Sequence, residues 1–423
     1  MNTGSTHHAG IVGLGYVGLP LALAMAESGF GVTGVDIDET RVKQLRSAHS
    51  YVEDISGQRV RDAVDESLAV TTEYESLKGA DIVSICVPTP LDKTNRPDLS
   101  YVRDTAQRLT DVVSDQCVVV LESTVYPGAT EEIIASTFQK AGFTIGEDVY
   151  VAFSPERVDP GNETYDLVEI PKVLGGVTPE CGDRAQAIYE QVFDEIVRVS
   201  SAQNAELTKL IENTFRSVNI ALVNELTTVA HEIDADIWET INAAKTKPFG
   251  FMPFYPGPGL GGHCLPIDPL YLSWEAGNHG TDVEFIELAD EINRGMPEYV
   301  VRRVIDILND HGHPIPESDV LILGLSYKAG ISDTRESPAF DVIGRLQDRG
   351  ATITVSDPHV PEIQVSDERY RSVDLTPELV SEHDCTVVLV DHEEFDLELV
   401  VETAPVVFDT RNATKDSVNV YRL

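Results

Sequence analysis

Positive charge is scarce in this chain of 423 residues. Lys and Arg together number 31 against 71 Asp and Glu, which gives a formal net charge of −40 and a pI of about 4.4. This balance argues against nucleic-acid and anionic-membrane partners, because both need clustered cations. The acidic residues are spread along the whole chain. Such a surface favours a halophilic, salt-adapted protein, since salt screens self-repulsion; an ordinary acidic enzyme is the alternative.

Cysteine and long apolar runs are scarce too. The five cysteines are odd in number and include no close pair, so we expect reduced thiols rather than a disulfide framework. No Cys/His grouping has zinc spacing, and no metal is expected. No run approaches the ~20 apolar residues of a membrane helix, and the first residues lack a signal-peptide pattern. We therefore predict a cytoplasmic protein.

Apolar residues make up 42% of the chain, which is enough for globular cores, and the length predicts two to three domains. In the first 200 residues, short apolar runs alternate with helical patterns, which predicts βαβ units and a parallel sheet. The expected strands there are 9–12, 32–35, 82–87, 117–121 and 149–153, with a helix at 19–27.

A second region begins near Ser201. Residues 201–233 contain no Pro or Gly and repeat apolar residues at a spacing of three to four, which predicts one helix of about 50 Å capped by Ser201. We expect this helix to link two domains and to carry a homodimer or higher homo-oligomer interface. Strand and helix patterns alternate again from residue 320, where Ser337 caps a helix that Gly350 ends.

The predicted fold class is therefore α/β. Two Rossmann-like, doubly wound parallel-sheet domains are expected at residues 1–200 and 313–423. A long central helix and a helical middle region, residues 201–312, are expected to join them.

The most specific generic motif is GLGYVG at residues 13–18, which follows an expected strand and opens a helix. Its glycines allow a tight turn and let backbone N–H groups approach a pyrophosphate. Asp36 ends the next strand, where it would bind ribose hydroxyls and repel a 2′-phosphate. NAD is the expected cofactor, with Arg41 near enough to soften the preference over NADP. A purely structural turn is the alternative.

A second glycine cluster surrounds Cys264 in PGPGLGGHCLPIDP (256–269). So many glycines indicate backbone pressed against a ligand. Cys264 is either a nucleophile, which needs a positive neighbour, or a small buried side chain. His263 is expected to shape the loop or bind phosphate or sugar rather than to take a proton.

Polar residues also mark the long helix and two strand ends. Lys209 and Asn213 lie four residues apart and share a helix face that Arg216 extends; a solvated stripe is the alternative. Residues 122–124 and 154–157 follow expected strands. Ligands of doubly wound sheets bind at such carboxyl ends, although either segment could be an ordinary loop.

Taken in order, these motifs resemble the UDP-glucose/GDP-mannose 6-dehydrogenase family. The resemblance spans residues 11–412 and rests on GLGYVGLPLA (13–22), VPTP (87–90), ESTVYPG (122–128), SPERVDPGN (154–162), KLIENTFRSVNIALVNE (209–225), PGPGLGGHCLPIDP (256–269) and LGLSYKAGISDTRESPA (323–339). Residues 246–264 are most similar to the UDP-N-acetylglucosamine 6-dehydrogenase branch. UDP-N-acetylmannosamine and UDP-glucose dehydrogenases are the alternatives in the family. A non-catalytic NAD-binding regulator and a two-electron dehydrogenase are the alternatives outside it.

The resemblance implies a four-electron oxidation that consumes two NAD⁺ per turnover. The 6-hydroxymethyl group of a UDP-sugar becomes an aldehyde, Cys264 captures it as a thiohemiacetal, a second oxidation gives a thioester, and water releases the acid. By resemblance, Lys209 stabilises oxyanions, Asn213 positions the reacting group or a water, and Asp268 handles protons. Thr124 and Glu156 would line the water and cofactor region.

The resemblance also implies the ligand contacts. Tyr327 and Lys328 resemble a nucleotide-sugar clamp, and Pro160 stands where UDP-glucose enzymes have a second Glu, which favours the N-acetylated branch. The expected cofactor residues are Gly13, Gly15, Tyr16, Val17, Gly18, Asp36, Arg41, Pro88, Thr89, Thr124 and Arg335. The expected substrate residues are Glu156, Arg157, Lys209, Asn213, Arg216, Tyr255, Gly257, Gly261, His263, Tyr327 and Lys328.

Overall fold

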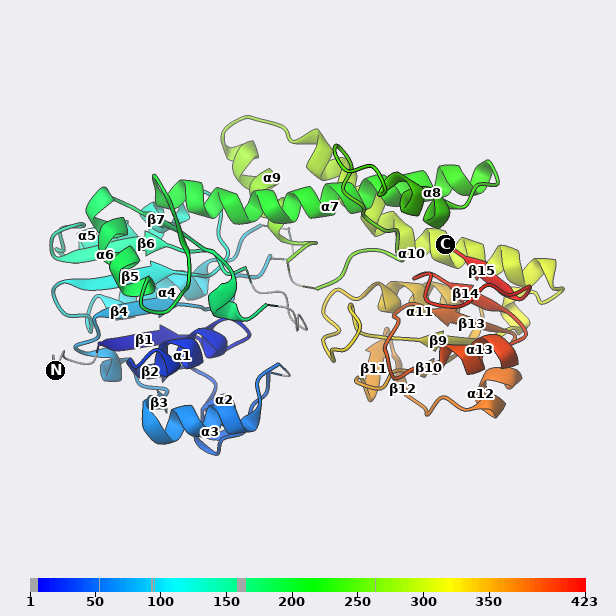
Figure 1. Ribbon diagram of the computed structural model, residues 1–423, viewed down its shortest axis with the longest axis horizontal. Coiled ribbons are helices and arrows are strands. Elements are labelled where there is room, and N and C mark those ends of the chain that lie inside the picture. The colour runs from blue at the N-terminus through cyan, green and yellow to red at the C-terminus, as the bar shows by residue number, and fades with distance from the viewer. Residues whose placement is uncertain (1–6, 53, 93, 95, 158–164, 263) are drawn as a thin grey trace. The chain divides into compact units, whose positions relative to one another are not determined.

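The computed structural model describes residues 7–52, 54–92, 94, 96–157, 165–262 and 264–423. Pro160 and His263, both singled out from the sequence, lie outside these residues. The chain forms two compact units, one of residues 1–212 with 270–281 and one of residues 213–269 with 282–423. The helical middle region is thus divided between the two units (Figure 1).

The first unit is built on a sheet whose described strands have the order β3-β2-β1-β4-β5-β6-β7-β8. Its strands are β1 (His8–Val12), β2 (Gly31–Val35), β3 (Leu68–Thr71), β4 (Ile82–Ile85), β5 (Cys117–Leu121), β6 (Val149–Phe153), β7 (Lys172–Gly176) and β8 (Ile196–Val199). Its helices are α1 (Gly18–Glu27), α2 (Glu39–Arg46), α3 (Gly57–Glu66), η1 (Tyr74–Leu77), α4 (Ser100–Leu109), η2 (Thr130–Ala135), α5 (Ser136–Lys140), η3 (Leu167–Glu169) and α6 (Pro179–Tyr189).

β1 is an interior strand of this sheet, third in the order of its described strands. It pairs in parallel with β2 and with β4, and Gly10 lies opposite Thr33 on one side and Val83 on the other. The strand order therefore reverses between β1 and β4. The carboxyl ends of these two strands flank the point at which doubly wound sheets bind ligands.

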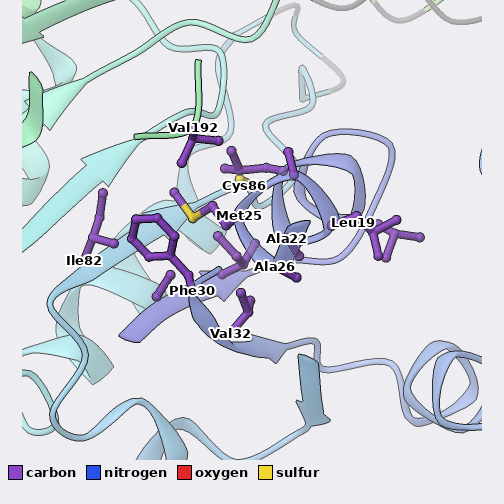
Figure 2. Packing of buried hydrophobic residues seen from close by; sticks show 14 of the residues in the cluster. Leu19, Ala22, Met25, Ala26, Phe30, Val32, Ile82, Cys86 and Val192 are labelled. Carbon is purple, nitrogen blue, oxygen red and sulfur yellow. The ribbon is translucent and has the colours of Figure 1, made fainter. Parts of the chain in front are cut away.

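The main core of the first unit forms where α1 packs on the sheet. Leu19, Ala22 and Met25 are fully buried. Figure 2 shows them gathered with Phe30 and with Val192, which comes from a segment far away in the sequence. Burial of each large apolar side chain contributes about 1.5–3 kcal/mol, so this packing fixes the start of α1 at the end of β1.

The second unit contains a parallel sheet with the order β10-β9-β13-β14-β15 and a separate antiparallel pair, β11–β12. Its strands are β9 (Asp319–Leu323), β10 (Thr352–Ser356), β11 (Glu362–Val365), β12 (Glu368–Arg371), β13 (Cys385–Val388), β14 (Val407–Asp409) and β15 (Val420–Arg422). Its helices are α8 (Ile237–Ala244), α10 (Glu284–Asp310), η4 (Ile315–Glu317), α11 (Pro338–Asp348), α12 (Pro377–Glu382) and α13 (Leu397–Thr403). Helices α7 (Ala202–Glu232) and α9 (Asp268–Asn278) have residues in both units.

Several local predictions are confirmed. α7 is one uninterrupted helix of 31 residues, about 46 Å at 1.5 Å per residue, and Ser201 Oγ accepts from the N–H of Asn204. Ser337 caps α11 ahead of Pro338, and Gly350 follows it at φ 92°. The α/β class with two doubly wound sheets is confirmed as well. Within the described residues, no helix is long and apolar enough to cross a membrane.

The sequence prediction missed several strands and one strand direction. The missed strands are β3, β7, β8, β11, β12 and β15, all of three to five residues. They are short and carry little periodic signal. The first sheet was predicted to be parallel, but β7 runs antiparallel to β6. Antiparallel strands on an otherwise parallel sheet are common in doubly wound folds, and this one places a charged residue in the candidate site.

Candidate functional site

The loop after β1 is shaped to receive an anionic ligand. A Cβ on Gly13, whose φ is 88°, would lie 2.6 Å from the carbonyl oxygen of Cys86, and a Cβ on Gly18 would lie 1.8 Å from that of Gly13. At Gly15 no atom would lie within 4 Å of a Cβ. The N-terminus of α1 has no side-chain cap and no acidic residue in its first turn. Backbone N–H groups can therefore approach a pyrophosphate here.

Asp36 holds this loop from the end of β2. Its carboxylate is buried and accepts from the N–H groups of Leu14 at 2.8 Å and Asp38 at 2.9 Å. Arg41 Nη1 lies 3.5 Å from Asp36 Oδ2, so its charge is offset by a carboxylate. Each carboxylate oxygen has a further lone pair, and the arrangement fits the ribose of a dinucleotide.

The remaining cofactor residues of this unit lie around the same edge. Thr89, which follows β4, is buried, and its carbonyl accepts from the hydroxyl of Tyr271 at 2.7 Å. Ser123 Oγ donates to the carbonyl of Val87 at 2.7 Å. This bond ties the segment that carries Thr124 to the segment after β4. Tyr16, Val17, Pro88 and Thr124 are half-buried or exposed.

A buried charge cluster, Glu122–Lys172–Glu156–Tyr189, lies at the carboxyl edge of this sheet. Lys172 Nζ lies 2.6 Å from Glu122 Oε2 and 3.7 Å from Glu156 Oε2. Tyr189 donates its hydroxyl proton to Glu122. Burial alone would lower the pKa of Lys172, but the charges of Glu122 and Glu156 raise it overall, so the ammonium stays charged. Sequence reasoning singled out Glu156 and missed Lys172 and Tyr189.

Arg157 and Lys209 differ in whether a described residue pairs with their positive charge. The Arg157 guanidinium donates to Glu212 at 2.7 Å and to the carbonyl of Pro171 at 2.6 Å. Lys209, on α7, is 8% exposed, and its ammonium makes no ion pair with any described residue. Unpaired buried cations are costly, which marks Lys209 as a group that a ligand could satisfy.

In the second unit, three predicted residues come together around a turn. Cys264 is exposed, whereas the other four cysteines are buried, and all five are free thiols. The Cys264 carbonyl accepts from the N–H of Asp268 at 2.9 Å. Asp268 is 2% exposed and accepts from the side-chain amide of Asn213 at 2.5 Å. Asn213 follows Lys209 by one turn of α7, and Arg216 is exposed.

The glycine-rich loop presses against the protein itself. A Cβ on Gly261 would lie 2.5 Å from Tyr327 Cβ, and one on Gly262 would lie 2.9 Å from the Tyr327 ring. The sequence suggested backbone pressed against a ligand, but at these positions the close neighbour is the loop that carries Tyr327 and Lys328. The Arg335 carbonyl accepts from the N–H of Gly262 at 2.9 Å, and the Arg335 guanidinium pairs with Asp333 at 2.5 Å.

A cavity of about 440 Å³ lies beside this loop, lined by Trp238, Asn242, Tyr255, Pro256, Asp391, Arg411 and Asn412. The rings of Trp238 and Tyr255 are stacked with centroids 5.8 Å apart. Arg411 Nε donates to the carbonyl of Leu389, and burial lowers the pKa of this Arg against the charges of Asp391 and Asp409. A Cβ on Gly257 would lie 3.0 Å from Arg411 Nη1.

Sequence reasoning included Tyr255 and Gly257 but missed Arg411. The signal was present, because Arg411 follows β14 at the carboxyl edge of a parallel sheet. A guanidinium and two aromatic rings around one cavity suit an anionic, ring-containing ligand.

Comparison with known proteins decides the family. Profiles of the UDP-glucose/GDP-mannose dehydrogenase family match the NAD binding domain over residues 7–193, the central domain over 203–295 and the UDP binding domain over 321–416. The chain is 35% identical over 416 residues to a UDP-N-acetyl-D-mannosamine dehydrogenase of Methanococcus maripaludis, covering 95% of this chain and 92% of the relative. The chain belongs to this family.

Two further similar proteins are also sugar-nucleotide dehydrogenases by name. An NDP-N-acetyl-D-galactosaminuronic acid dehydrogenase of Ralstonia solanacearum is 37% identical, with 95% of each chain covered. A solved structure of a UDP-D-ManNAc dehydrogenase from Pyrococcus horikoshii matches with a TM-score of 0.89 and 32% identity over 98% of both chains. The protein is thus a nucleotide-sugar dehydrogenase by family, and its cofactor is NAD. None of these names supports the UDP-N-acetylglucosamine branch predicted from the sequence.

Proposed function

We propose that this enzyme oxidises the 6-hydroxymethyl group of a UDP-linked 2-acetamido sugar to the carboxylate, with UDP-N-acetylmannosamine as the favoured substrate. The names of its relatives support the N-acetylmannosamine assignment. One observation carries the chemistry: the exposed thiol, Cys264, shares a turn with the buried Asp268, whose carboxylate accepts a hydrogen bond from Asn213 on α7. A two-electron dehydrogenase would have no need of such a nucleophile.

In this proposal the second unit makes and breaks the covalent bond. Cys264 Sγ adds to the C6 aldehyde to form a thiohemiacetal, and loss of a hydride converts it to a thioester. NAD, when bound, accepts the hydride in each of the two oxidations. Asp268 takes the proton released as Sγ adds, and the Asn213 amide orients the Asp268 carboxylate by its hydrogen bond. Hydrolysis then restores the thiol and releases the acid.

In this proposal, residues of the first unit stabilise the oxyanion at C6 and hold the attacking water. Lys209 is a buried cation without a carboxylate partner among the described residues, and it stabilises the oxyanion that develops at C6. Glu156 and Thr124 hold the water that attacks the thioester. Glu156 is suited to this task because its carboxylate lies at the carboxyl edge of the sheet beside a buried ammonium.

The second unit also supplies the nucleotide contacts. We assign the diphosphate to Lys328 and Arg411 and the base to the cavity beside Tyr255, because cations and stacked rings match a uridine diphosphate. Arg335 is assigned to the cofactor, as the resemblance implies. Functional domains at residues 1–200, 201–312 and 313–423 then correspond to cofactor binding, chemistry and nucleotide-sugar binding.

The experiment is an NADH assay of purified protein with UDP-N-acetylmannosamine, UDP-N-acetylglucosamine, UDP-N-acetylgalactosamine and UDP-glucose. We expect the first to give the highest kcat/KM and two NADH per sugar acid. A ratio of one would disprove the four-electron reaction. NAD binding without NADH from any sugar would favour the non-catalytic alternative, and highest activity with UDP-N-acetylglucosamine would restore the branch predicted from the sequence.

We also propose that α7 pairs with a second copy of the chain. Large apolar side chains recur along one exposed stripe of this helix: Ile211, Phe215, Leu222, Leu226 and Val229, each at least 44% exposed. Spacing of three, four or seven residues keeps them on one face, and a contiguous exposed apolar patch indicates an interface. Sedimentation should give a dimer or higher homo-oligomer, and Leu222→Glu with Leu226→Glu should give a monomer.

A further inference from the structure

The direction of β7 creates the buried charge cluster. β6 and β7 pair antiparallel with Phe153 opposite Gly175. Continuing this register places Lys172, the first residue of β7, opposite Glu156, which follows β6. In a parallel β7 the same Lys would lie at the far edge of the sheet. The single antiparallel pair described in this sheet therefore delivers an ammonium to the carboxyl edge, where the proposed water-activating carboxylate lies.

Lys172 is shared by two carboxylates. Its side chain is 4% exposed, that of Glu122 is 0% exposed and that of Glu156 is 6% exposed. Nζ is closer to Glu122, at 2.6 Å, than to Glu156, at 3.7 Å. Two negative groups thus compete for one positive group in a place where water screens little.

Each carboxylate has further neighbours. Glu122 accepts from the hydroxyl of Tyr189, whose oxygen lies 3.1 Å from Ser84 Oγ. Glu156 Oε1 accepts from the N–H of Arg157 at 2.7 Å. The Arg157 guanidinium is turned to Glu212, and the thiol of Cys86, whose pKa burial raises, adds no charge near Glu156. Lys172 is therefore the cation that the described ion pairs give to Glu156.

A buried ion pair is weak grounds for stability, because desolvation consumes most of the Coulombic gain. Burial raises the pKa of Glu122 despite the charge of Lys172. A buried charge cluster at the carboxyl edge of a doubly wound sheet is therefore a candidate for a functional role.

We propose that Lys172 is a positioning residue that orients the Glu156 carboxylate and supplies the positive charge facing it during thioester hydrolysis, and that Glu122 sets the strength of this effect by competing for the same ammonium. The inference rests on the proposed role of Glu156. It assigns to Lys172 and Glu122 functions that act through Glu156 and require no contact with the sugar.

Two variants should change the electrostatic environment of the Glu156 carboxylate in opposite directions. Glu122→Gln leaves the whole Lys172 charge to Glu156, so the acidic limb of the kcat profile should shift down by about one pH unit. The double variant Lys172→Met with Glu122→Gln removes one cation and one carboxylate together, which keeps the net charge of the cluster and leaves Glu156 without its cation. It should shift the limb up by about one unit, so that kcat falls about tenfold at pH values below the wild-type limb and changes little above both limbs. Lys172→Arg keeps the cation and should restore a nearly native profile.

A second readout separates this inference from the proposed function. In protein labelled with ¹³C at the Glu carboxyl carbon, the Glu156 resonance is assigned by its loss in Glu156→Gln, and its titration is followed by NMR in each variant. If the wild type makes no NADH from any sugar, the proposed function fails while this titration still measures the coupling. Opposite shifts in the two variants support the inference. Unmoved titration in both, with NAD binding and thermal unfolding intact, overturns it.

Discussion

The two sheet units share one local design around the first turn. Gly13 and Gly324 follow the interior strands β1 and β9 with φ of 88° and 92°. Their N–H groups donate to the ends of the neighbouring strands β2 and β10, at 2.8 and 2.9 Å. In both units the next residue donates its N–H to an Asp that ends or follows that neighbour: Leu14 to Asp36 at 2.8 Å, and Leu325 to Asp357 at 2.6 Å.

The units differ in the segment after this turn. In the first unit the open Gly15 comes next, and α1 begins at Gly18. In the second unit the corresponding residue is Ser326, which is fully buried and donates to the carbonyl of Lys328, and the helix α11 begins only at Pro338. The first turn can therefore receive a pyrophosphate at a helix N-terminus. The second turn instead supports a long loop that carries Tyr327, Lys328 and Arg335.

The side chains that flank the two Asp residues differ as well. Asp36 is flanked by Arg41, whose side chain is 42% exposed. Asp357 is flanked by His392, whose side chain is fully buried and whose Nε2 lies 3.1 Å from the carboxylate. Gly330 N–H donates to His392 Nδ1, so Nε2 carries the proton that it gives to Asp357. The same carboxylate position is thus flanked by an exposed Arg in one unit and by a buried His in the other.

The largest expected effect lies outside both turns. If each sheet unit binds and Cys264 reacts, Cys264→Ser should lower acid formation at least ~1,000-fold, because the hydroxyl is a far weaker nucleophile than a thiolate. NAD and UDP should bind with native affinity, measured by calorimetry on the same protein. Near-native turnover in this variant would remove the covalent step.

A smaller loss should result from filling the first turn. Gly18→Ala places a Cβ 1.8 Å from the carbonyl oxygen of Gly13, so the turn must open, and we expect NAD affinity to fall about 100-fold, or ~2.7 kcal/mol. Gly15→Ala is the matched control for the fold of the turn. Nothing lies within 4 Å of a Cβ at Gly15, so this substitution should leave the fold unchanged. Ser326→Gly in the second unit should leave NAD affinity native. If Gly18→Ala and the wild type bound NAD equally well, the first turn would not be the pyrophosphate site, and the proposed difference between the two turns would be wrong.

The same substitution in both units should then separate binding from loop support. Asp36→Asn and Asp357→Asn each set an amide donor against backbone donors, and each should cost its own unit about 2 kcal/mol. Only Asp36→Asn should weaken NAD binding as well. The two tryptophans report the units separately, since Trp274 lies in the first and Trp238 in the second. Unfolding can be followed by fluorescence in Trp238→Phe and Trp274→Phe backgrounds.

The Asp357 effect has a definite pH dependence. Burial acts to raise the pKa of Asp357, but hydrogen bonds from His392 and the backbone lower it overall. A lowered folded-state pKa stabilises the protein above the unfolded value of about 3.9 and stops doing so as pH falls through the folded value. The stability difference between wild type and Asp357→Asn should thus be full at pH 6 and decrease steadily below pH ~4. A constant difference down to acid unfolding would show that His392 does not tune Asp357.

Local signals in the sequence were sufficient for the first turn and for the helix boundaries. A glycine motif after an apolar strand, a Ser-Pro pair and a Gly after a helix each specify their own backbone. Asp36 could be predicted because it ends the next expected strand. The Lys172–Glu122 pair could not, since its members are 50 residues apart and depend on the direction of a five-residue strand. His392 also owes its position to strand order, which no local pattern encodes.

The smallest expected effect is that of salt, and the acidic charge is spread along both units. We propose that the net charge of −40 is an adaptation to high ionic strength, because the Debye length grows from about 3 Å at 1 M to 30 Å at 0.01 M salt and self-repulsion grows with it. Dilution of KCl should lower Tm by about 2–4 °C for each kcal/mol lost, and both single-tryptophan variants should report it.

Sucrose at matched osmolality is the control, since it strengthens burial without screening charge and should not replace KCl. Equal stability in dilute buffer would reject salt adaptation, and a response of Trp274 alone would place the destabilising charge in the first unit.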